Sequence, residues 1–377
     1  MRLAWCRPAT GLSDRLDDSA ALVDELRSHH DITRLDQSSM HELVRLDFRQ
    51  PFDLVVYELA DTDDHAFLWP YVLHYPGLVR LRSASLHHSR ATSLARQRRG
   101  DDRRAELAFG RGDLSVAPLV ASRLVVVHDE YLAASLRPEY PHAQLRVVPL
   151  GWGRESLFAG GSLKIDSRPH SPLRIGLLGH APRQTIVHAV RRAMQSGASL
   201  ELMAGASSDA VLRDADVIVA LPWPPCDDLI PAIAAMSSGR PLVISETESS
   251  AGWPTLDPQT WLPRGIAARE RPIAVAIDPR DEEHSLALAL RRLAADPSLA
   301  ANLGGAAQAW WREHATLSQA VTAWQAALQE AASLAPPRHG EDWPPHLTAD
   351  GTARARAILG EFAVTVDFLG QTGDSLN

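Results

Sequence analysis

The chain has 377 residues, of which 45% are hydrophobic and 22% charged, and its formal net charge is −8. This is the composition of an ordinary globular protein, so it excludes wholesale disorder and fibrous repeats, and the negative charge argues against a nucleic-acid partner. The length predicts two or three domains. The two cysteines, Cys6 and Cys226, are too few for a disulfide scaffold or a zinc site built on several cysteines.

No apolar run reaches the roughly 18 residues that a membrane-spanning helix needs. The apolar stretch at residues 3–6 is also too short for the core of a signal peptide. From these two features we expect a cytoplasmic protein.

Short apolar runs alternate with helical patterns through the first half of the chain. After the first run, Leu16, Ala20, Val23 and Leu26 recur at helical spacing. Because strand, helix and strand in repetition favour a parallel sheet with helices on both faces, we expect a doubly wound α/β unit. Its strands are predicted at residues 3–6, 53–57, 77–81, 123–127 and 145–149.

Residues 151–172 are rich in glycine, serine and proline without a sustained period, which is typical of a linker. The alternation then resumes, and from residue 281 the pattern is purely helical, with a break at Asp296-Pro297. This half has strands predicted at 173–178, 199–203, 216–221, 241–245 and 273–277, and a helix at 185–194. We therefore predict one unit at 1–165, a second at 166–335, and an appendage at 336–377 with a helix over 352–362.

Two doubly wound units joined by a linker create a cleft, which the carboxyl ends of both sheets face. Ligands of open α/β sheets bind at such edges, where helix N-termini stabilise anions. Four common signatures are missing from the chain: G-x-G-x-x-G after either first strand, G-x-x-x-x-G-K-[ST], G-x-S-x-G and H-E-x-x-H. Their absence argues against a dinucleotide enzyme, a P-loop protein, and the usual hydrolases and zinc proteases.

Several short segments occur in an order that is specific as a set. In the first half they read Tyr57-Glu58-Leu59-Ala60-Asp61, His65-Ala66-Phe67-Leu68-Trp69, Tyr75-Pro76-Gly77, Leu86-His87-His88 and Val147-Val148-Pro149-Leu150-Gly151. In the second half they read Asp216-Val217-Ile218-Val219-Ala220-Leu221, Trp223-Pro224, Ala235-Met236-Ser237-Ser238-Gly239-Arg240-Pro241-Leu242-Val243, and 286–324 with Asp296-Pro297 and His314. The set, which spans most of residues 1–330, resembles the bacterial family 4 glycosyltransferases.

The resemblance implies the GT-B fold, with two doubly wound parallel-sheet domains facing across a cleft and a helical C-terminal appendage. It also implies transfer of a sugar from a nucleoside-diphosphate sugar to a hydroxyl of a glycan, a lipid-linked glycan or a small molecule. Anomeric configuration would be retained, and neither a metal nor another cofactor would be needed. A non-catalytic partner subunit or carbohydrate-binding scaffold of the same fold is the alternative, and a sugar epimerase of the same architecture is a third reading.

Donor-binding residues are expected where the second unit turns from strand to helix. A helix predicted over about 227–238 offers free N–H groups to phosphates. Near the start of this helix the family has a glutamate whose carboxylate accepts hydrogen bonds from the ribose hydroxyls, and Asp227 is the nearest match to it in this chain. Asp227 and Asp228 also suit plain helix capping. Arg183 is the candidate for gripping the diphosphate. The expected donor-binding set is Gly11, Gly179, His180, Arg183, Cys226, Asp227, Asp228, Leu229 and Ile230.

Two residues are candidates for the sugar and acceptor end of the site. His65 matches a histidine common in the family's subgroup, although a helix-start histidine bonded to backbone is the simpler alternative. Arg82 stands where the family places the histidine of a Leu-His-Asp triplet. The chain departs from the family pattern at two further positions, with Ala234 in place of a second glutamate and Gln184 at the usual lysine.

Residues 80–104 contain eight arginines and two aspartates. Such a basic stretch in an acceptor domain can contact a lipid-phosphate acceptor or an anionic membrane surface. In a chain whose positive charge is almost all arginine, the other reading is a solvated face.

Overall fold

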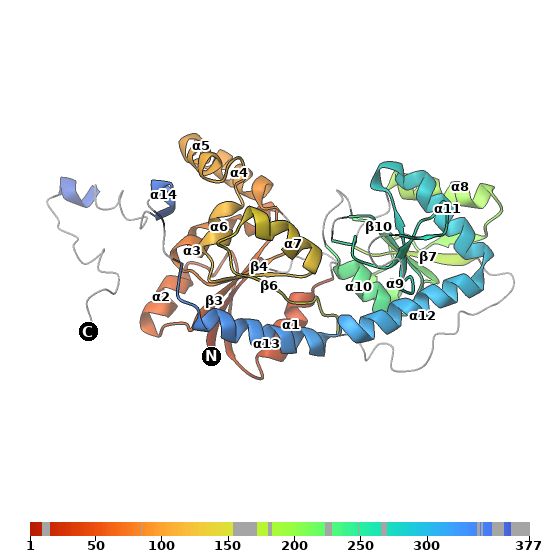
Figure 1. Ribbon diagram of the computed structural model, residues 1–377, viewed down its shortest axis with the longest axis horizontal. Coiled ribbons are helices and arrows are strands. Elements are labelled where there is room, and N and C mark those ends of the chain that lie inside the picture. The colour runs from red at the N-terminus through yellow and green to blue at the C-terminus, as the bar shows by residue number, and fades with distance from the viewer. Residues whose placement is uncertain are drawn as a thin grey trace.

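The computed structural model describes residues 1–9, 16–83, 85–153, 172–179, 183–222, 228–247, 249–264, 270–337, 340, 342–348 and 358–362. They form two α/β units that lie side by side (Figure 1). None of the described helices is both long and apolar enough to cross a membrane.

The first unit is built on a six-stranded parallel sheet with the order β2-β1-β3-β4-β5-β6. Its strands are β1 (Arg2–Cys6), β2 (Asp31–Leu35), β3 (Leu54–Leu59), β4 (Leu78–Leu81), β5 (Leu124–Val127) and β6 (Leu145–Val147). Its helices are α1 (Asp18–Leu26), α2 (Glu42–Arg49), the 3₁₀ helix η1 (Asp63–Leu68), α3 (Trp69–His74), α4 (His87–Arg96), α5 (Gly100–Phe109), α6 (Val116–Ala121) and α7 (Glu130–Glu139).

Both faces of this sheet are buried, and alternate residues of each strand enter different cores. Ala4 and Cys6 of β1 pack with α3, α6 and α7 on one face, whereas Leu3 and Trp5 pack with α1 on the other. This alternation follows from the pleat of a β-strand, in which successive side chains point to opposite faces of the sheet. The period of two therefore decides which polar residues near the strand ends share a face.

The second unit has a seven-stranded sheet with the order β12-β11-β13-β10-β9-β7-β8, which is parallel except between β11 and β12. Its strands are β7 (Leu173–Leu177), β8 (Leu200–Leu202), β9 (Val217–Ala220), β10 (Leu242–Ser245), β11 (Thr255–Leu256), β12 (Pro263–Arg264) and β13 (Ala274–Ile277). Its helices are α8 (Gln184–Gln195), α9 (Ser208–Asp214), α10 (Ile230–Ser237), the 3₁₀ helix η3 (Pro279–Asp281), α11 (Glu282–Ala295) and α12 (Pro297–His314).

Helix α13 (Leu317–Ser333) carries the chain back to the first unit. It begins at a capping box in which Thr316 and Gln319 bond each other's backbone. Its Trp324 packs beside Trp5, with ring centroids 5.4 Å apart, and α13 lies along the first sheet (Figure 1). Residues 317–333 fall within the expected second unit, 166–335, yet their apolar face is buried on the first sheet.

The two chain crossings between the units run next to each other. The backbone N–H of Trp152 donates to the carbonyl oxygen of Ala315 over 3.0 Å, and Trp152 forms a β-bridge with Thr316. The predicted boundary at residue 165 lies outside the described residues, so the structure leaves it a prediction.

The C-terminal segment also returns to the first unit. Helix α14 (Pro345–Thr348) places Leu347, which is 1% exposed, in the core beside α3. The Nε2 of His346 lies 2.7 Å from Glu106 of α5. Of the helix expected over 352–362, residues 352–357 lie outside the described part; residues 358–361 are helical, with Ile358 47% and Phe362 72% exposed.

The predicted fold class and the predicted strands are confirmed, with ends shifted by one or two residues. Strand β2 was not predicted, because only Ile32 and Leu35 of its five residues are buried and its apolar signal is correspondingly weak. Strands β11 and β12 have two residues each, too few for a period to appear.

Candidate functional site

Polar side chains gather at the carboxyl ends of the first sheet, on the face that α1 covers. Glu58 in β3 and Arg80 in β4 follow the pleat of the apolar residues that point toward α1, and Arg82 lies two positions after Arg80. Asp18 and Ser19 come from the start of α1, where Asp17 is the N-cap. We call Asp18, Ser19, Glu58, Arg80, Arg82 and His128 the floor cluster.

Arg80 is the centre of the floor cluster and is 1% exposed. Its Nη1 donates to Ser19 Oγ over 2.5 Å, its Nη2 donates to Asp18, and its Nε donates to His128 Nε2 over 3.1 Å. Its guanidinium also lies over the ring of Trp324 of α13, 5.6 Å from the ring centroid. All three nitrogens of Arg80 are therefore engaged, which a lysine in this position could not reproduce.

Arg82 is partly open to solvent, with 22% of its side chain exposed. Its Nη1 lies 3.0 Å from Asp18 Oδ1, 3.2 Å from Ser19 Oγ and 3.4 Å from Glu58 Oε2. Burial alone would lower the pKa of Arg82, but the carboxylates of Asp18, Glu58 and Asp228 outweigh it and raise the pKa. Asp228 belongs to the second unit, so one of the charges that raise the pKa of Arg82 comes from that unit.

The two buried carboxylates stay ionised. Burial on its own would raise the pKa of Glu58, yet the guanidinium groups of Arg80, Arg7 and Arg82 lower it to about 2. The pKa of Asp18 is likewise lowered by Arg80 and Arg82 against the effect of burial. Glu58 also accepts hydrogen bonds from Trp5 Nε1 at 2.7 Å and Ser19 Oγ at 2.8 Å.

His128, which follows β5, is held in its neutral form. Burial, together with the charge of Arg80, lowers its pKa to about 3. Nε2 accepts from Arg80, so the proton is on Nδ1, which lies 3.0 Å from the carbonyl oxygen of Val148. Both ring nitrogens of His128 are therefore engaged within the first unit.

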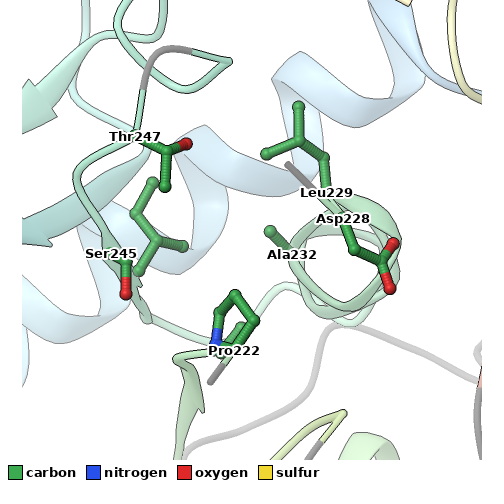
Figure 2. Close-up of a pocket in the computed structure, with 8 residues that line it drawn as sticks. Pro222, Asp228, Leu229, Ala232, Ser245 and Thr247 are labelled. Carbon is green, nitrogen blue, oxygen red and sulfur yellow. The ribbon is translucent and has the colours of Figure 1, made fainter. Parts of the chain in front are cut away.

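A pocket opens at the matching edge of the second unit, between the ends of β9 and β10 and the start of α10 (Figure 2). Ser245 and Thr247 line one side, and Leu229 and Ala232 line the other. The carboxylate of Asp228 points away from Ser245 and Thr247. Two hydroxyl side chains thus lie opposite the N-terminus of α10 in a pocket whose other lining residues, apart from Asp228, are apolar.

The start of α10 is partly capped by the chain itself. Asp228 Oδ1 accepts from the N–H of Ile230 over 3.2 Å, and Pro231 lies in the first turn, where its missing N–H costs little. The side chain of Ile230 is 1% exposed and belongs to the core rather than to the pocket. Gly179, at φ +86°, lies so close that an added Cβ would meet Pro231 Cγ at 3.0 Å. The loop after β7 and the start of α10 are therefore in contact.

Arg183 lies at the start of α8 and is occupied by an acidic partner. Its Nη2 donates to Glu282 Oε2 over 2.7 Å and to the carbonyl oxygen of Leu221 over 3.2 Å. Thr185 Oγ1 donates to the other oxygen of Glu282 over 2.6 Å. Arg183 is thus next to the pocket edge at Leu221, but it reaches a phosphate only by exchanging this ion pair.

His65 lies in η1, away from the floor cluster. Its Nδ1 is 2.8 Å from Thr62 Oγ1 and 3.5 Å from Asp64 Oδ1, and the described residues provide no contact between it and Arg82. Its ring contacts are thus local to the start of η1, with side chains rather than with the backbone that the simpler alternative named.

Four residues of the expected donor-binding set lie outside the described residues: Gly11, His180, Cys226 and Asp227. Of the two departures from the family pattern in the second unit, Gln184 is exposed at the start of α8. Ala234 is fully buried in the core behind the pocket, so position 234 does not present its side chain to a ligand.

The arginine-rich stretch 80–104 is largely neutralised within the first unit. Beside Arg80 and Arg82, Arg90 pairs with Glu106 in a buried two-point contact at 2.5 and 2.8 Å. Arg96 pairs with Asp63, Arg99 with Asp102, and Arg104 with Asp101. For six of the eight arginines the described residues thus provide an acidic partner, which favours the solvated-face reading over a free basic surface.

Sequence reasoning missed Asp18, Ser19 and His128, and it used Glu58 and Arg80 only as parts of longer segments. A signal was present at two of them, because Glu58 and Arg80 interrupt strands that are otherwise apolar. A charged residue inside a buried strand needs a partner of opposite charge. Among the described residues, no group of three or more His, Cys, Asp and Glu side chains could hold a metal ion.

No known family model and no curated protein sequence matches the chain. Among solved structures it is similar to sucrose-phosphate synthase from Thermosynechococcus elongatus, with a TM-score of 0.59 and 14% identity over 87% of this chain and 98% of that one. It is also similar to Anabaena HepE in complex with UDP and glucose (TM-score 0.55, 10% identity, 87% and 99% covered). A third is WaaG, a glycosyltransferase involved in lipopolysaccharide biosynthesis (TM-score 0.52, 10% identity, 88% and 100% covered). The chain has the GT-B fold.

In this GT-B chain the floor cluster and the pocket lie at the carboxyl ends of the two parallel sheets, which is where open α/β sheets bind ligands. At 10–14% identity the likeness is one of architecture, and the assignment to family 4 stays a prediction.

Proposed function

We propose that the chain is a glycosyltransferase that moves a sugar from a nucleoside-diphosphate sugar to a hydroxyl acceptor. The observation that carries the proposal is that polar groups gather at the carboxyl ends of both sheets, with Arg82 on the first unit and Asp228 at the start of α10 on the second. A transferase of two substrates needs a site for each, on opposite walls of one cleft. The complex of HepE with UDP and glucose supports the choice of donor class, because that protein shares the fold.

The donor would bind at the pocket of the second unit. The start of α10 and the loop at Gly179 would approach the diphosphate, and Asp227, Asp228 or both would accept ribose hydroxyls. Arg183 would exchange Glu282 for a phosphate oxygen. Catalysis would come mostly from positioning and from stabilising the charge of the leaving phosphate.

We further propose that transfer proceeds with retention of anomeric configuration and without a metal. These two statements rest on the sequence resemblance. Arg82 would contact the sugar or the acceptor as a fixed hydrogen-bond donor, because a guanidinium does not accept a proton. His65 would act only indirectly, by holding the turn after β3.

A non-catalytic protein of the same fold is the second candidate. This candidate is favoured because both arginines proposed to contact substrate already form ion pairs within the chain. Arg82 pairs with Asp18 and Glu58, and Arg183 pairs with Glu282. Such a scaffold would bind a nucleotide or a sugar without turning it over.

The test is a calorimetric titration with UDP, GDP and ADP, with and without EDTA, followed by mass-detected transfer or hydrolysis of the matching sugar nucleotides. We expect one nucleotide to bind, to raise the Tm, and to be unaffected by EDTA. Saturation at 100 times the Kd stabilises a protein by about 2.7 kcal/mol. Binding without turnover of any donor supports the scaffold, and no binding at all refutes both readings.

Asp227→Ala is the matched variant for the donor site. Losing charge-assisted hydrogen bonds, each worth about 1.5–3 kcal/mol, weakens binding by roughly one to two orders of magnitude. Arg82→Ala, on the other wall, serves as the control and leaves nucleotide affinity within about threefold. Equal losses of nucleotide affinity in the two variants would contradict the assignment of donor binding to the second unit.

A further inference from the structure

The floor cluster and its surroundings hold equal numbers of opposite charges. Arg7 pairs with Asp17 at 2.6 Å, and Arg80 and Arg82 share the carboxylates of Asp18 and Glu58. The neighbouring His128 is neutral. The three arginines and three carboxylates are Arg7, Arg80, Arg82, Asp17, Asp18 and Glu58.

We propose that the acceptor group contacted by Arg82 is an uncharged sugar hydroxyl, and that Asp18, Glu58 and Asp228 make this wall of the cleft select against anionic acceptors. The proposal rests on the proposed function and names the substrate class of its acceptor side. Asp18 and Glu58 are positioning residues in it, because they act through Arg82.

Arg82 has hydrogen-bonding capacity left for a ligand. Its three side-chain contacts are all made through Nη1, and among the described residues Nε and Nη2 have no partner. Part of the side chain is exposed. The guanidinium is thus fixed on one side by buried carboxylates and can donate from the other.

The charge of Arg82, however, is already matched. Asp18 and Glu58 lie 3.0 and 3.4 Å from the same nitrogen, and Asp228 adds a further negative charge from the opposite wall. A carboxylate or phosphate entering here would meet three carboxylates, Asp18, Glu58 and Asp228, against the two guanidinium groups of Arg80 and Arg82. Like charges at such distances repel, and the partly buried setting screens them less than bulk water does.

A hydroxyl group fits the same place. It can accept a hydrogen bond from Arg82 without bringing a negative charge toward Asp18, Glu58 and Asp228. Asp228 is exposed, and its one described hydrogen bond uses Oδ1 for the N–H of Ile230. The arginine-rich stretch adds little further attraction for an anion, because four more of its arginines have acidic partners of their own: Arg90, Arg96, Arg99 and Arg104.

The deciding experiment is a titration of the full chain with inorganic phosphate, observed by NMR at the Arg82 Nε–H. The chain is labelled with ¹⁵N-arginine, the resonance is assigned by its loss in Arg82→Lys, and ionic strength is kept constant with NaCl. We expect no saturable shift of this resonance at phosphate concentrations up to about 20 mM. A saturable shift with a Kd below about 5 mM in the unaltered chain overturns the proposal.

Charge-removing variants show whether the carboxylates are the cause. We expect Asp228→Asn and Glu58→Gln each to produce a phosphate-dependent shift of the Arg82 resonance. Asp228 is exposed, so Asp228→Asn keeps the test valid even if Glu58→Gln does not fold. An unchanged, flat titration in a folded Asp228→Asn chain refutes the role of Asp228 in excluding anions.

Transfer assays extend the test to substrates once a donor is found. Paired acceptors that differ only at C6, such as octyl β-glucoside with a hydroxymethyl group and octyl β-glucuronide with a carboxylate, are compared under identical conditions. We expect at least tenfold higher kcat/KM for the neutral member, and equal use of both overturns the proposal. If no nucleotide binds, the proposed function fails, while the phosphate titration still decides whether this wall excludes anions.

Discussion

Arg80 donates a hydrogen bond from Nε to the Nε2 of His128 over 3.1 Å. This bond makes Nε2 an acceptor and leaves the ring proton on Nδ1, which faces the carbonyl oxygen of Val148 at 3.0 Å. A second proton on His128 would have to point at a guanidinium. The pair therefore links the charge state of the His128 ring to the integrity of the floor cluster.

The free energy of unfolding should decrease as the pH is lowered from 7 to 5, because of His128. Its pKa is about 3 in the folded chain and near 6.5 in the unfolded chain, so between these values the unfolded state binds the extra proton. The contribution is present above pH 6.5 and is lost as the pH falls, by about 2 kcal/mol between pH 7 and pH 5. Urea unfolding at pH 7, 6 and 5 measures it.

His128→Gln is the control for that series, since it retains an acceptor for Arg80 without a titrating ring. We expect its unfolding free energy to depend less on pH between 7 and 5 than that of the unaltered chain. Glu58 and Asp18 lose their stabilising charge only at lower pH, because their unfolded carboxyl groups titrate near 4 to 4.5. Parallel pH profiles for both proteins would refute the link to His128.

Arg80→Met should destabilise the fold strongly. Removing one partner of a buried ion pair leaves Asp18 and Glu58 without their main counter-charge, which typically costs about 3–5 kcal/mol. Arg104→Met breaks an ion pair with Asp101 that is exposed, and we expect a change within about 1 kcal/mol. Chemical denaturation of the two variants side by side measures the difference, and similar losses would count against the floor cluster as a structural unit.

Gly179→Ala tests the contact between the loop after β7 and α10. Both Gly179 (φ +86°) and Gly197 (φ +94°) have left-handed backbone, so alanine costs about 1–2 kcal/mol at either position. Only at Gly179 would the new Cβ meet another group, Pro231 Cγ at 3.0 Å. We expect Gly179→Ala to lower nucleotide affinity as well as stability, and Gly197→Ala to lower stability alone, by calorimetry and thermal unfolding.

Glu282→Gln should release Arg183. If Arg183 has to leave Glu282 to hold a phosphate, a neutral partner at 282 competes less, and nucleotide binding tightens by roughly three- to tenfold. Arg183→Met should weaken binding by about tenfold or more. Calorimetric titration of both variants decides the point: unchanged affinity in Arg183→Met removes this residue from the donor site.

Residues inside the regular elements were predictable, and several site residues were not. The runs at 217–221 and 241–244 are apolar throughout, and a strand covered on both faces produces that pattern. His65 and Arg82 were both selected from a sequence pattern, but the structure brings only Arg82 to the floor cluster. Strand period says which face a residue takes, whereas it does not say which neighbour from another strand it meets.

The amino-acid sequence by itself determined the two doubly wound units, their order and the strands that deliver the chain to the cleft, because periodicity and apolar runs are local properties. Only the tertiary structure decided that Asp18 of α1, Glu58 of β3 and Arg80 of β4 meet, since they are brought together by the parallel order of the sheet. It also decided that α13 returns to the first sheet, because Trp324 finds its partner Trp5 some 300 residues earlier in the chain. The ion pairs of Arg82 with Asp18 and of Arg183 with Glu282 likewise join residues that are far apart in the sequence. Such pairs depend on how whole elements pack, which local sequence patterns do not specify.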